Sequence, residues 1–279
     1  MRRRALQAVL LASAFGSLCI WAVVLSMAPR LRAREASNRL IEKAQQIAGG
    51  ADPAASRELV DEALAADPEN PRAHRELAMH LLARGETEQA VGELERAALA
   101  DPANSGAALE VAAVLHAQQD MEATLHWLRE AARREPDSGL TYTVIAQCLL
   151  ESKDIPGALR AAQRAVALSP RYEPAYVVLG SARWQSRDLP GARAAFDEAL
   201  RLRPSDVDAL LAAASVSHAL GLSDPALDYA RRAVGAGPRD RRAWLAFAQL
   251  LADRGRAAEA QQALSRARAL PTPGGSSRP

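Results

Sequence analysis

The residues best suited to metal binding or nucleophilic chemistry are few in this chain and lie far apart. The two cysteines, Cys19 and Cys148, stand in separate regions and form neither a metal-ligand pair nor a disulfide framework. The histidines are His74, His80, His116, His126 and His218. None of them has the close spacing of a metal site, and the chain lacks a glycine-rich phosphate loop and a nucleophile elbow. We therefore expect no enzyme activity, no metal and no cofactor.

The overall composition excludes further classes of protein. Lys and Arg number 35 against 33 Asp and Glu, which gives a formal charge of +2 and no electrostatic footprint for nucleic acid. Hydrophobic residues make up 49% of the chain, so wholesale disorder is also excluded. Aromatic residues are only 4%, while alanine is plentiful, a balance that favours closely approaching helices over a bulky core.

The first 28 residues predict a membrane anchor. Arg2, Arg3 and Arg4 precede the stretch from Ala5 to Ala28, which contains no charge. A helix of that length reaches about 36 Å at 1.5 Å per residue, enough to cross a hydrocarbon core of about 30 Å. A cleaved signal peptide and a buried soluble helix are the alternatives. Small residues precede Pro29 as a signal peptidase requires, but the apolar stretch exceeds the usual h-region of about 7–15 residues, so we favour the anchor.

Basic residues flank both ends of this stretch and bear on its orientation. Those that follow it are Arg30, Arg32, Arg34, Arg39 and Lys43. A short basic tail before a long apolar run usually stays in the cytoplasm. We therefore expect a single-pass protein of a bacterial inner membrane, with the rest of the chain on the periplasmic side.

The prolines recur at a fixed interval, which is the main organising signal of the sequence. Steps of 34 residues separate Pro68, Pro102, Pro136, Pro170, Pro204 and Pro238. With each proline at position 32, the units begin at Ser37, Pro71, Ser105, Gly139, Glu173, Val207 and Arg241. Small residues then occupy positions 8, 20 and 27 of every unit. Position 27, for instance, is Ala63, Ala97, Ala131, Ala165, Ala199, Ala233 and Ala267.

Large residues recur in the same register. Position 4 carries Tyr142, Tyr176 and Trp244, and position 24 carries Leu94, Leu128, Phe196 and Leu264. From Ser37 to Leu270, this pattern of small and large residues resembles the tetratricopeptide repeat. The resemblance implies an all-α, right-handed superhelical solenoid of helix-turn-helix units, preceded here by one transmembrane helix. Helical geometry agrees, because positions 4, 7, 8 and 11 share one helix face and positions 20, 24 and 27 share another.

Turn residues indicate where the helices begin and end. Asp52, Asn70 and Asp224 each precede a proline, as an N-cap precedes the first helical position. Gly85, Gly221 and Gly255 stand at position 15, where the first helix of a unit must stop. The chain thus divides into a transmembrane anchor or uncleaved signal (1–28), a juxtamembrane or degenerate capping helix (29–52), a solenoid (53–270) and a disordered tail (271–279). The solenoid holds about six full repeats and a partial first one, and the helix of the capping segment is expected over 34–48.

The resemblance also implies a binding groove, since first-helix positions 2, 5, 9, 12 and 13 line the concave surface in this family. The implied partner-binding residues are Met79, Leu82, Leu109, His116, Thr143, Gln147, Val177, Ser181, Trp184, Leu211, Ser215, His218, Leu245 and Gln249. The Lys and Asn set with which chaperone-binding members clamp a carboxylate is absent. A mixed apolar and polar groove favours an extended or helical protein segment held by apolar anchors.

Trp184 is the most informative of these residues. Position 11 of its unit is Arg183, where neighbouring units have Leu115 and Leu149. Trp184 either turns inward to replace the missing leucine or stands exposed as a binding anchor.

The pattern as a whole favours a membrane-anchored scaffold or adaptor that binds other proteins, in the assembly of an envelope complex. A structural solenoid that associates with copies of itself, or a secreted repeat protein after signal cleavage, is the alternative. The sequence does not indicate the partner or the oligomeric state.

Overall fold

The structure is a computed structural model, and it describes residues 27–48 and 52–271. The expected anchor over 1–28 and the expected tail over 271–279 therefore lie, but for their innermost residues, outside the described residues. Within the described ranges, no helix combines the length and the apolar character needed to cross a bilayer.

The described residues form helices and no strand. Residues 27–48 are helical, and the helices that follow are α2 (Pro53–Ala66), α3 (Pro71–Ala83), α4 (Thr87–Ala100), α5 (Ser105–Ala117), α6 (Met121–Arg134), α7 (Gly139–Glu151), α8 (Ile155–Leu168), α9 (Glu173–Gln185), α10 (Leu189–Leu202), α11 (Val207–Ala219), α12 (Ser223–Ala236), α13 (Arg241–Asp253) and α14 (Ala257–Ala269). The chain divides after Arg134 into two compact parts that each contain several repeats, here called unit 1 and unit 2. Without a number, the word unit continues to mean one 34-residue repeat.

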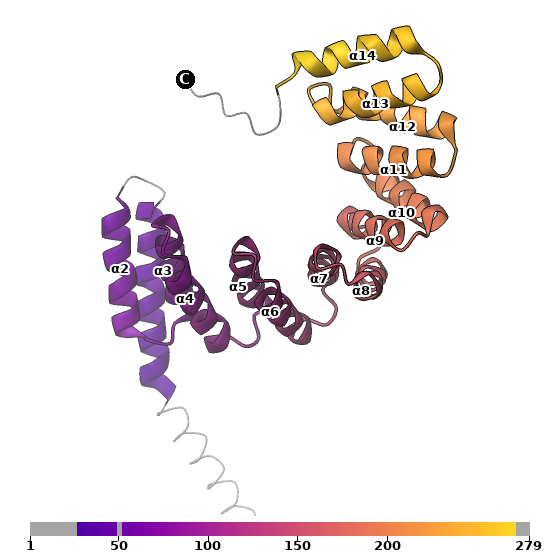
Figure 1. Cartoon of the computed structure of the whole chain (residues 1–279). Helices are drawn as coiled ribbons and strands as arrows, with labels where there is room; N and C mark the ends of the chain where they lie inside the picture. The colour runs from indigo at the N-terminus through magenta and orange to yellow at the C-terminus, as the bar shows by residue number, and fades with distance from the viewer. Residues whose placement is uncertain (1–26, 49–51, 272–279) are drawn as a thin grey trace, which may run out of the picture. The chain divides into compact units, whose positions relative to one another are not determined.

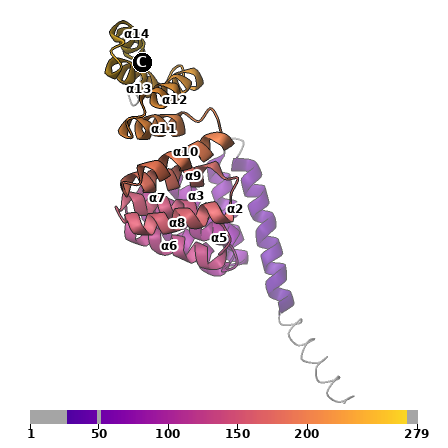
Figure 2. The same cartoon turned by 90° about the vertical axis from the view of Figure 1, so that its right-hand side faces the viewer.

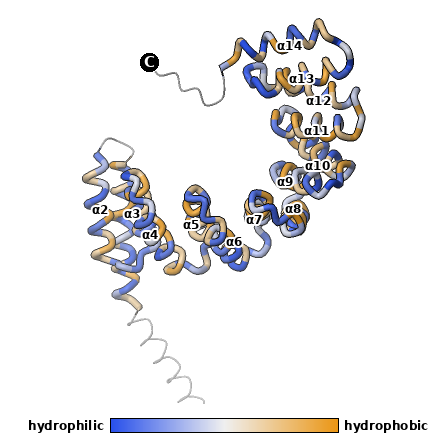
Figure 3. Tube along the Cα trace, in the orientation of Figure 1, coloured by the Kyte–Doolittle hydropathy of each residue, from blue (hydrophilic) through white to orange (hydrophobic). Residues whose placement is uncertain are grey.

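The helices repeat in the expected register. The first helix of each unit from α3 onward begins at position 1, and the second begins at position 17. Each pair packs closely, and each second helix also contacts the next first helix within its compact unit. Hydrophobic and hydrophilic residues alternate along every helix, as expected where one stripe is buried (Figure 3). The predicted all-α fold of helix-turn-helix units is confirmed.

The small residues lie where the helices cross. All seven alanines at position 27, from Ala63 to Ala267, are fully buried. The residues at positions 8 and 20 are buried too, including Ala78, Ala90 and Ser56. A larger side chain at these positions would separate the two helices, so the recurring small residues set how closely the helices approach.

The turn inside each unit needs a left-handed residue at position 15. Gly85, Gly221 and Gly255 have φ values of 77°, 76° and 73°, as expected for glycines that end a helix. Three further units reach the same conformation without glycine, at Gln119, Lys153 and Arg187, with φ between 63° and 68°. These three side chains therefore carry a conformational cost that the glycines avoid.

Two of the three predicted proline-linked N-caps are confirmed. Asp52 accepts from the amides of Ala54 and Ala55, and Asn70 accepts from the amide of Arg72 at 3.0 Å. The prediction for Asp224 was wrong, because α12 already begins at Ser223 and Asp224 lies in its first turn. Its carboxylate instead pairs with Arg254 at 2.6 Å.

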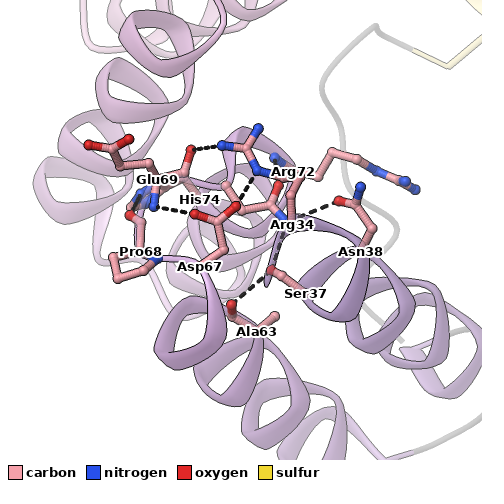
Figure 4. Close-up of polar contacts among 10 residues, drawn as sticks. Arg34, Ser37, Asn38, Ala63, Asp67, Pro68, Glu69, Arg72 and His74 are labelled. Carbon is pink, nitrogen blue, oxygen red and sulfur yellow. Dashed lines mark hydrogen bonds and ion pairs between the residues drawn. The ribbon is translucent and has the colours of Figure 1, made fainter. Parts of the chain in front are cut away.

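The helix over 27–48 extends further toward the N-terminus than the expected start at Arg34, and it runs past the ends of α2 and α3 (Figures 1 and 2). Arg34 stands where later units have their proline, so nothing breaks the helix there. Arg34 pairs with Asp67 and donates to the backbone oxygen of Glu69, while Ser37 donates to Ala63 at 2.8 Å (Figure 4). These contacts hold the helix against the end of α2.

Candidate binding surface

In unit 2 the first helices form the inner side. Helix α7 contacts α9, α9 contacts α11, and α11 contacts α13. Among the described residues of this unit, the second helices α8, α10, α12 and α14 make no contact of similar extent with one another. Helices that lie closer together occupy the shorter arc of a curved stack, so the first helices line the concave side of unit 2.

Three rows of side chains cross this inner side, one residue from each first helix. The row at position 5 is apolar, with Val177 and Leu211 half-buried and Leu245 41% exposed. The row at position 9 is polar and uncharged, with Gln147, Ser181, Ser215 and Gln249. Position 12 adds Leu150, Trp184 and His218. The middle of the inner side therefore carries little charge.

A pocket of about 240 Å³ opens in this surface between α9 and α11. Its lining residues are Ser181, Trp184, Gln185, Phe196, Ala212 and Ser215. Trp184 is half-buried and packs against the core cluster that contains Phe196. Trp184 therefore has features of both alternatives. Its ring packs against the core, as the inward alternative expects, and it also borders the pocket, where a binding anchor would lie.

The two serine hydroxyl groups at the pocket rim are satisfied within their own helices. Ser181 donates to the backbone oxygen of Val177 at 3.0 Å, and Ser215 donates to that of Leu211 at 2.9 Å. Since each hydroxyl hydrogen is used, the oxygen lone pairs remain available to accept from a bound group.

Charged residues border the uncharged middle of the inner side in pairs. Arg242 lies 2.8 Å from Asp208, and His218 lies 3.6 Å from Asp253, each pair joining α11 to α13. The hydrogen bonds that Arg242 donates to Asp240 and Asp208 raise the pKa of its guanidinium, which keeps its charge. No charged side chain lines the pocket itself.

The first-helix surface of unit 1 differs in charge. Arg75 forms a two-pronged ion pair with Glu110 that joins α3 to α5, and this contact raises the pKa of Arg75. Arg72 lies 3.7 Å from Glu42, and Gln45 donates to Glu76. These charges are matched within the unit, and the exposed apolar group beside them is Met79, at 61% exposure.

The predicted groove residues are distributed between the two units. Met79, Leu82, Leu109 and His116 belong to unit 1, and the other ten belong to unit 2. Most have an exposed or half-buried side chain on a first helix. Thr143 is the exception, because it is 4% exposed and donates to the oxygen of Gly139 at 2.8 Å, so it offers a partner almost no surface. The pocket unites Ser181, Trp184 and Ser215.

Two pocket residues were missed by sequence reasoning. Phe196 comes from a second helix, and Ala212 stands at position 6, outside the positions that the family resemblance assigns to the groove. A signal was nevertheless present at position 11, which is leucine in most units but Arg183 and Ser217 in the two that enclose the pocket. Arg183 does not fill the core as leucine would, since it donates to Gly191 at 3.0 Å.

The remaining reactive groups lie outside this surface. Cys148 is buried, and burial raises the pKa of its thiol to about 11, so a nucleophilic thiolate is disfavoured. In the part of the chain that the structure describes, no three metal-ligating side chains cluster. The inner side of unit 2 offers shape and hydrogen-bond acceptors, which suit binding.

Two sequence models of the tetratricopeptide repeat match the chain, over residues 48–115 and 177–241. These matches fall in different compact units. No curated protein sequence matches the chain significantly.

Several solved structures share the fold. PilW, described as a widely conserved type IV pilus biogenesis factor, is 19% identical with a TM-score of 0.62, over 71% of this chain and 92% of its own. PilF of Pseudomonas aeruginosa is 24% identical with a TM-score of 0.58, over 70% and 90% of the two chains. YrrB, described as having an unusual peptide-binding site, is 20% identical with a TM-score of 0.55, over 67% and 96%.

Proposed function

We propose that this chain, which belongs to the tetratricopeptide-repeat family, is a membrane-anchored scaffold that binds a segment of another protein and catalyses no reaction itself. The observation that carries the proposal is the inner side of unit 2, where half-buried and exposed side chains of α9, α11 and α13 form an apolar row beside an uncharged polar row. Such a surface suits a protein segment, because apolar contacts supply affinity while the polar row meets the segment's backbone.

The comparisons support this proposal at the level of the fold. Repeat solenoids in this family generally act as non-catalytic scaffolds, and one structural neighbour is described by a peptide-binding site. Another neighbour, PilW, is described as a type IV pilus biogenesis factor, so the assembly of an envelope complex is the process that we propose. Within unit 1, the predicted residues Met79, Leu82, Leu109 and His116 are proposed as partner-binding residues of that unit's own first helices.

The proposed location is a bacterial inner membrane, with the repeats on the periplasmic side. Support comes from Arg2, Arg3 and Arg4, followed by the uncharged stretch from Ala5 to Ala28. The chain should stay with the membrane after a carbonate wash, because leaving the bilayer would expose that stretch to water. Recovery of a soluble chain that starts at Pro29 would replace the anchor with a cleaved signal.

Site-specific photo-crosslinking in cells tests the scaffold function. A benzophenone amino acid placed at Gln147 or Gln249, on α7 and α13, should capture a partner protein. The same residue at Gln163 or Gln261, exposed on the second helices α8 and α14, provides the matched control. Equal capture from both sides would contradict an inner binding surface. Capture of another copy of this chain alone would favour self-association.

A further inference from the structure

We propose that the pocket between α9 and α11 receives one aromatic or large aliphatic side chain from an uncharged stretch of the partner protein. This inference rests on the proposed scaffold function and adds the chemistry that the partner must carry. Three observations support it: the size of the pocket, the absence of charged side chains in its lining, and the altered repeat pattern of the two units that enclose it.

The size of the pocket indicates a side chain as its occupant. Its volume of about 240 Å³ lies below the range of about 300–1,000 Å³ that is usual for small-molecule sites. The walls are the rings of Trp184 and Phe196 and the methyl group of Ala212. A single large apolar side chain therefore fits in it and would shield part of those surfaces from water.

The charge distribution excludes a charged occupant. No ionised group lines the pocket, and the nearby Arg242 and His218 already face Asp208 and Asp253. A charged side chain would lose its water there without gaining a counter-ion. Ser181, with its free lone pairs, can instead accept from a backbone amide beside the anchor residue.

The repeat pattern is altered in the two units that enclose the pocket. Position 11 is Leu81, Leu115, Leu149 and Leu251 in the other complete units, and all four are buried. In the units that supply α9 and α11 it is Arg183 and Ser217, and the buried Ser217 hydroxyl has no hydrogen-bond partner. Departures from the repeat pattern in two adjacent units, one of which leaves a buried hydroxyl unsatisfied, are typical of functional sites.

Peptide selection on the full-length chain tests the inference. The chain is held in lipid nanodiscs, and a displayed library of random heptapeptides is first depleted on empty nanodiscs, which removes peptides that bind lipid. The selected peptides should carry one Phe, Trp, Leu or Met within an uncharged stretch. A selection dominated by charged peptides would overturn the inference.

Two variants locate the binding. Ala212→Phe places a large side chain in the pocket. Ser215→Glu places a charge at the pocket rim, and the fold should tolerate this change because Ser215 is exposed. Each should weaken binding of the selected peptides about tenfold or more, as expected for an interface anchor. Ala194→Phe makes the same kind of change at an exposed site of the second helix α10, outside the pocket and the first-helix surface, and it should leave affinity unchanged.

The outcomes separate this inference from the scaffold function. If peptides bind but both pocket variants retain full affinity, the pocket assignment is wrong and the scaffold function stands. If no peptide is selected and photo-crosslinking from the inner residues also captures no protein, the scaffold function fails as well. Trp184→Ala provides a further check, because it should weaken binding even in preparations that circular dichroism shows to be folded.

Discussion

A pair of residues where α9 and α10 pack tightly allows a quantitative test of the packing. Gly180 on α9 takes position 8, where every other unit has alanine, and it faces Phe196 on α10. A β-carbon added at Gly180 would lie 2.7, 2.8 and 2.9 Å from three carbons of the Phe196 ring. Phe196 is only 2% exposed, so its ring has little room to move. We expect Gly180→Ala to destabilise the unit.

The magnitude follows from two opposing effects. Replacing glycine by alanine inside a helix stabilises it by about 1 kcal/mol, whereas overpacking a tight core costs about 1–3 kcal/mol. The net loss in the free energy of unfolding for Gly180→Ala should be about 1 kcal/mol. For a part of the chain as large as unit 2, this lowers the melting temperature by about 2–4 °C. Gly235→Ala on α12 is the matched control, because nothing lies within 4 Å of its added carbon. That variant should be slightly stabilised.

The second half of the test is a double-mutant cycle. Phe196→Leu alone should cost about 1–2 kcal/mol through the cavity that it leaves. Combined with Gly180→Ala, it recreates the alanine–leucine pair found at Ala78 and Leu94. The two changes should therefore compensate by about 1–2 kcal/mol, as residues in contact do. Thermal unfolding followed by circular dichroism at 222 nm measures all four proteins. Strict additivity, or a Gly180→Ala variant as stable as the Gly235 control, would show that the crossing is not tight.

Three further predictions test the packing and the turns, each by the same melting experiment. Ala199→Leu should destabilise unit 2 by about 1–3 kcal/mol, because position 27 is fully buried. Ala194→Leu, at an exposed site of the same helix, should change the stability little. Equal losses of stability would mean that the register is wrong. Arg187→Gly should stabilise by about 1 kcal/mol by relieving a φ of 68°, and Gly221→Ala should lose a similar amount; a neutral pair of results would contradict the cost assigned to this turn. Ser217→Ala should stabilise by about 1 kcal/mol, since it removes a buried hydroxyl without a partner; a loss would indicate a hydrogen bond to a bound water.

The features that sequence reasoning predicted correctly are those enforced by close helix crossings. A crossing admits only small residues, so the alanines at position 27 recur in every unit and define the register before any coordinates are known. The prolines and the glycines at position 15 add the helix ends. Together these constraints predict the residue at which the first helix of each unit begins, for every unit from α3 to α13.

Features without such a constraint were missed or placed wrongly. The left-handed residues Gln119 and Lys153 have side chains that carry no signal for that conformation. Asp224 before Pro225 has the residue types of an N-cap, but the common start of the second helices at position 17 takes precedence. The division after Arg134 falls where the 34-residue period continues without interruption, so nothing in the periodicity marks it.

The pocket belongs to a third kind of feature, one that is visible only as a departure from the repeat. Position 11 lacks leucine at Arg183 and Ser217, and position 8 lacks alanine only at Gly180, all within the two units that enclose the pocket. The glycine lets the Phe196 ring sit closer to α9 than a leucine could beside alanine. In a solenoid, regular positions maintain the stack, so a partner is best recognised by the units in which those positions are altered together. By that reasoning, we propose that α9 and α11 determine which segment is bound, and that the first helices α7 and α13 beside them add the flanking contacts.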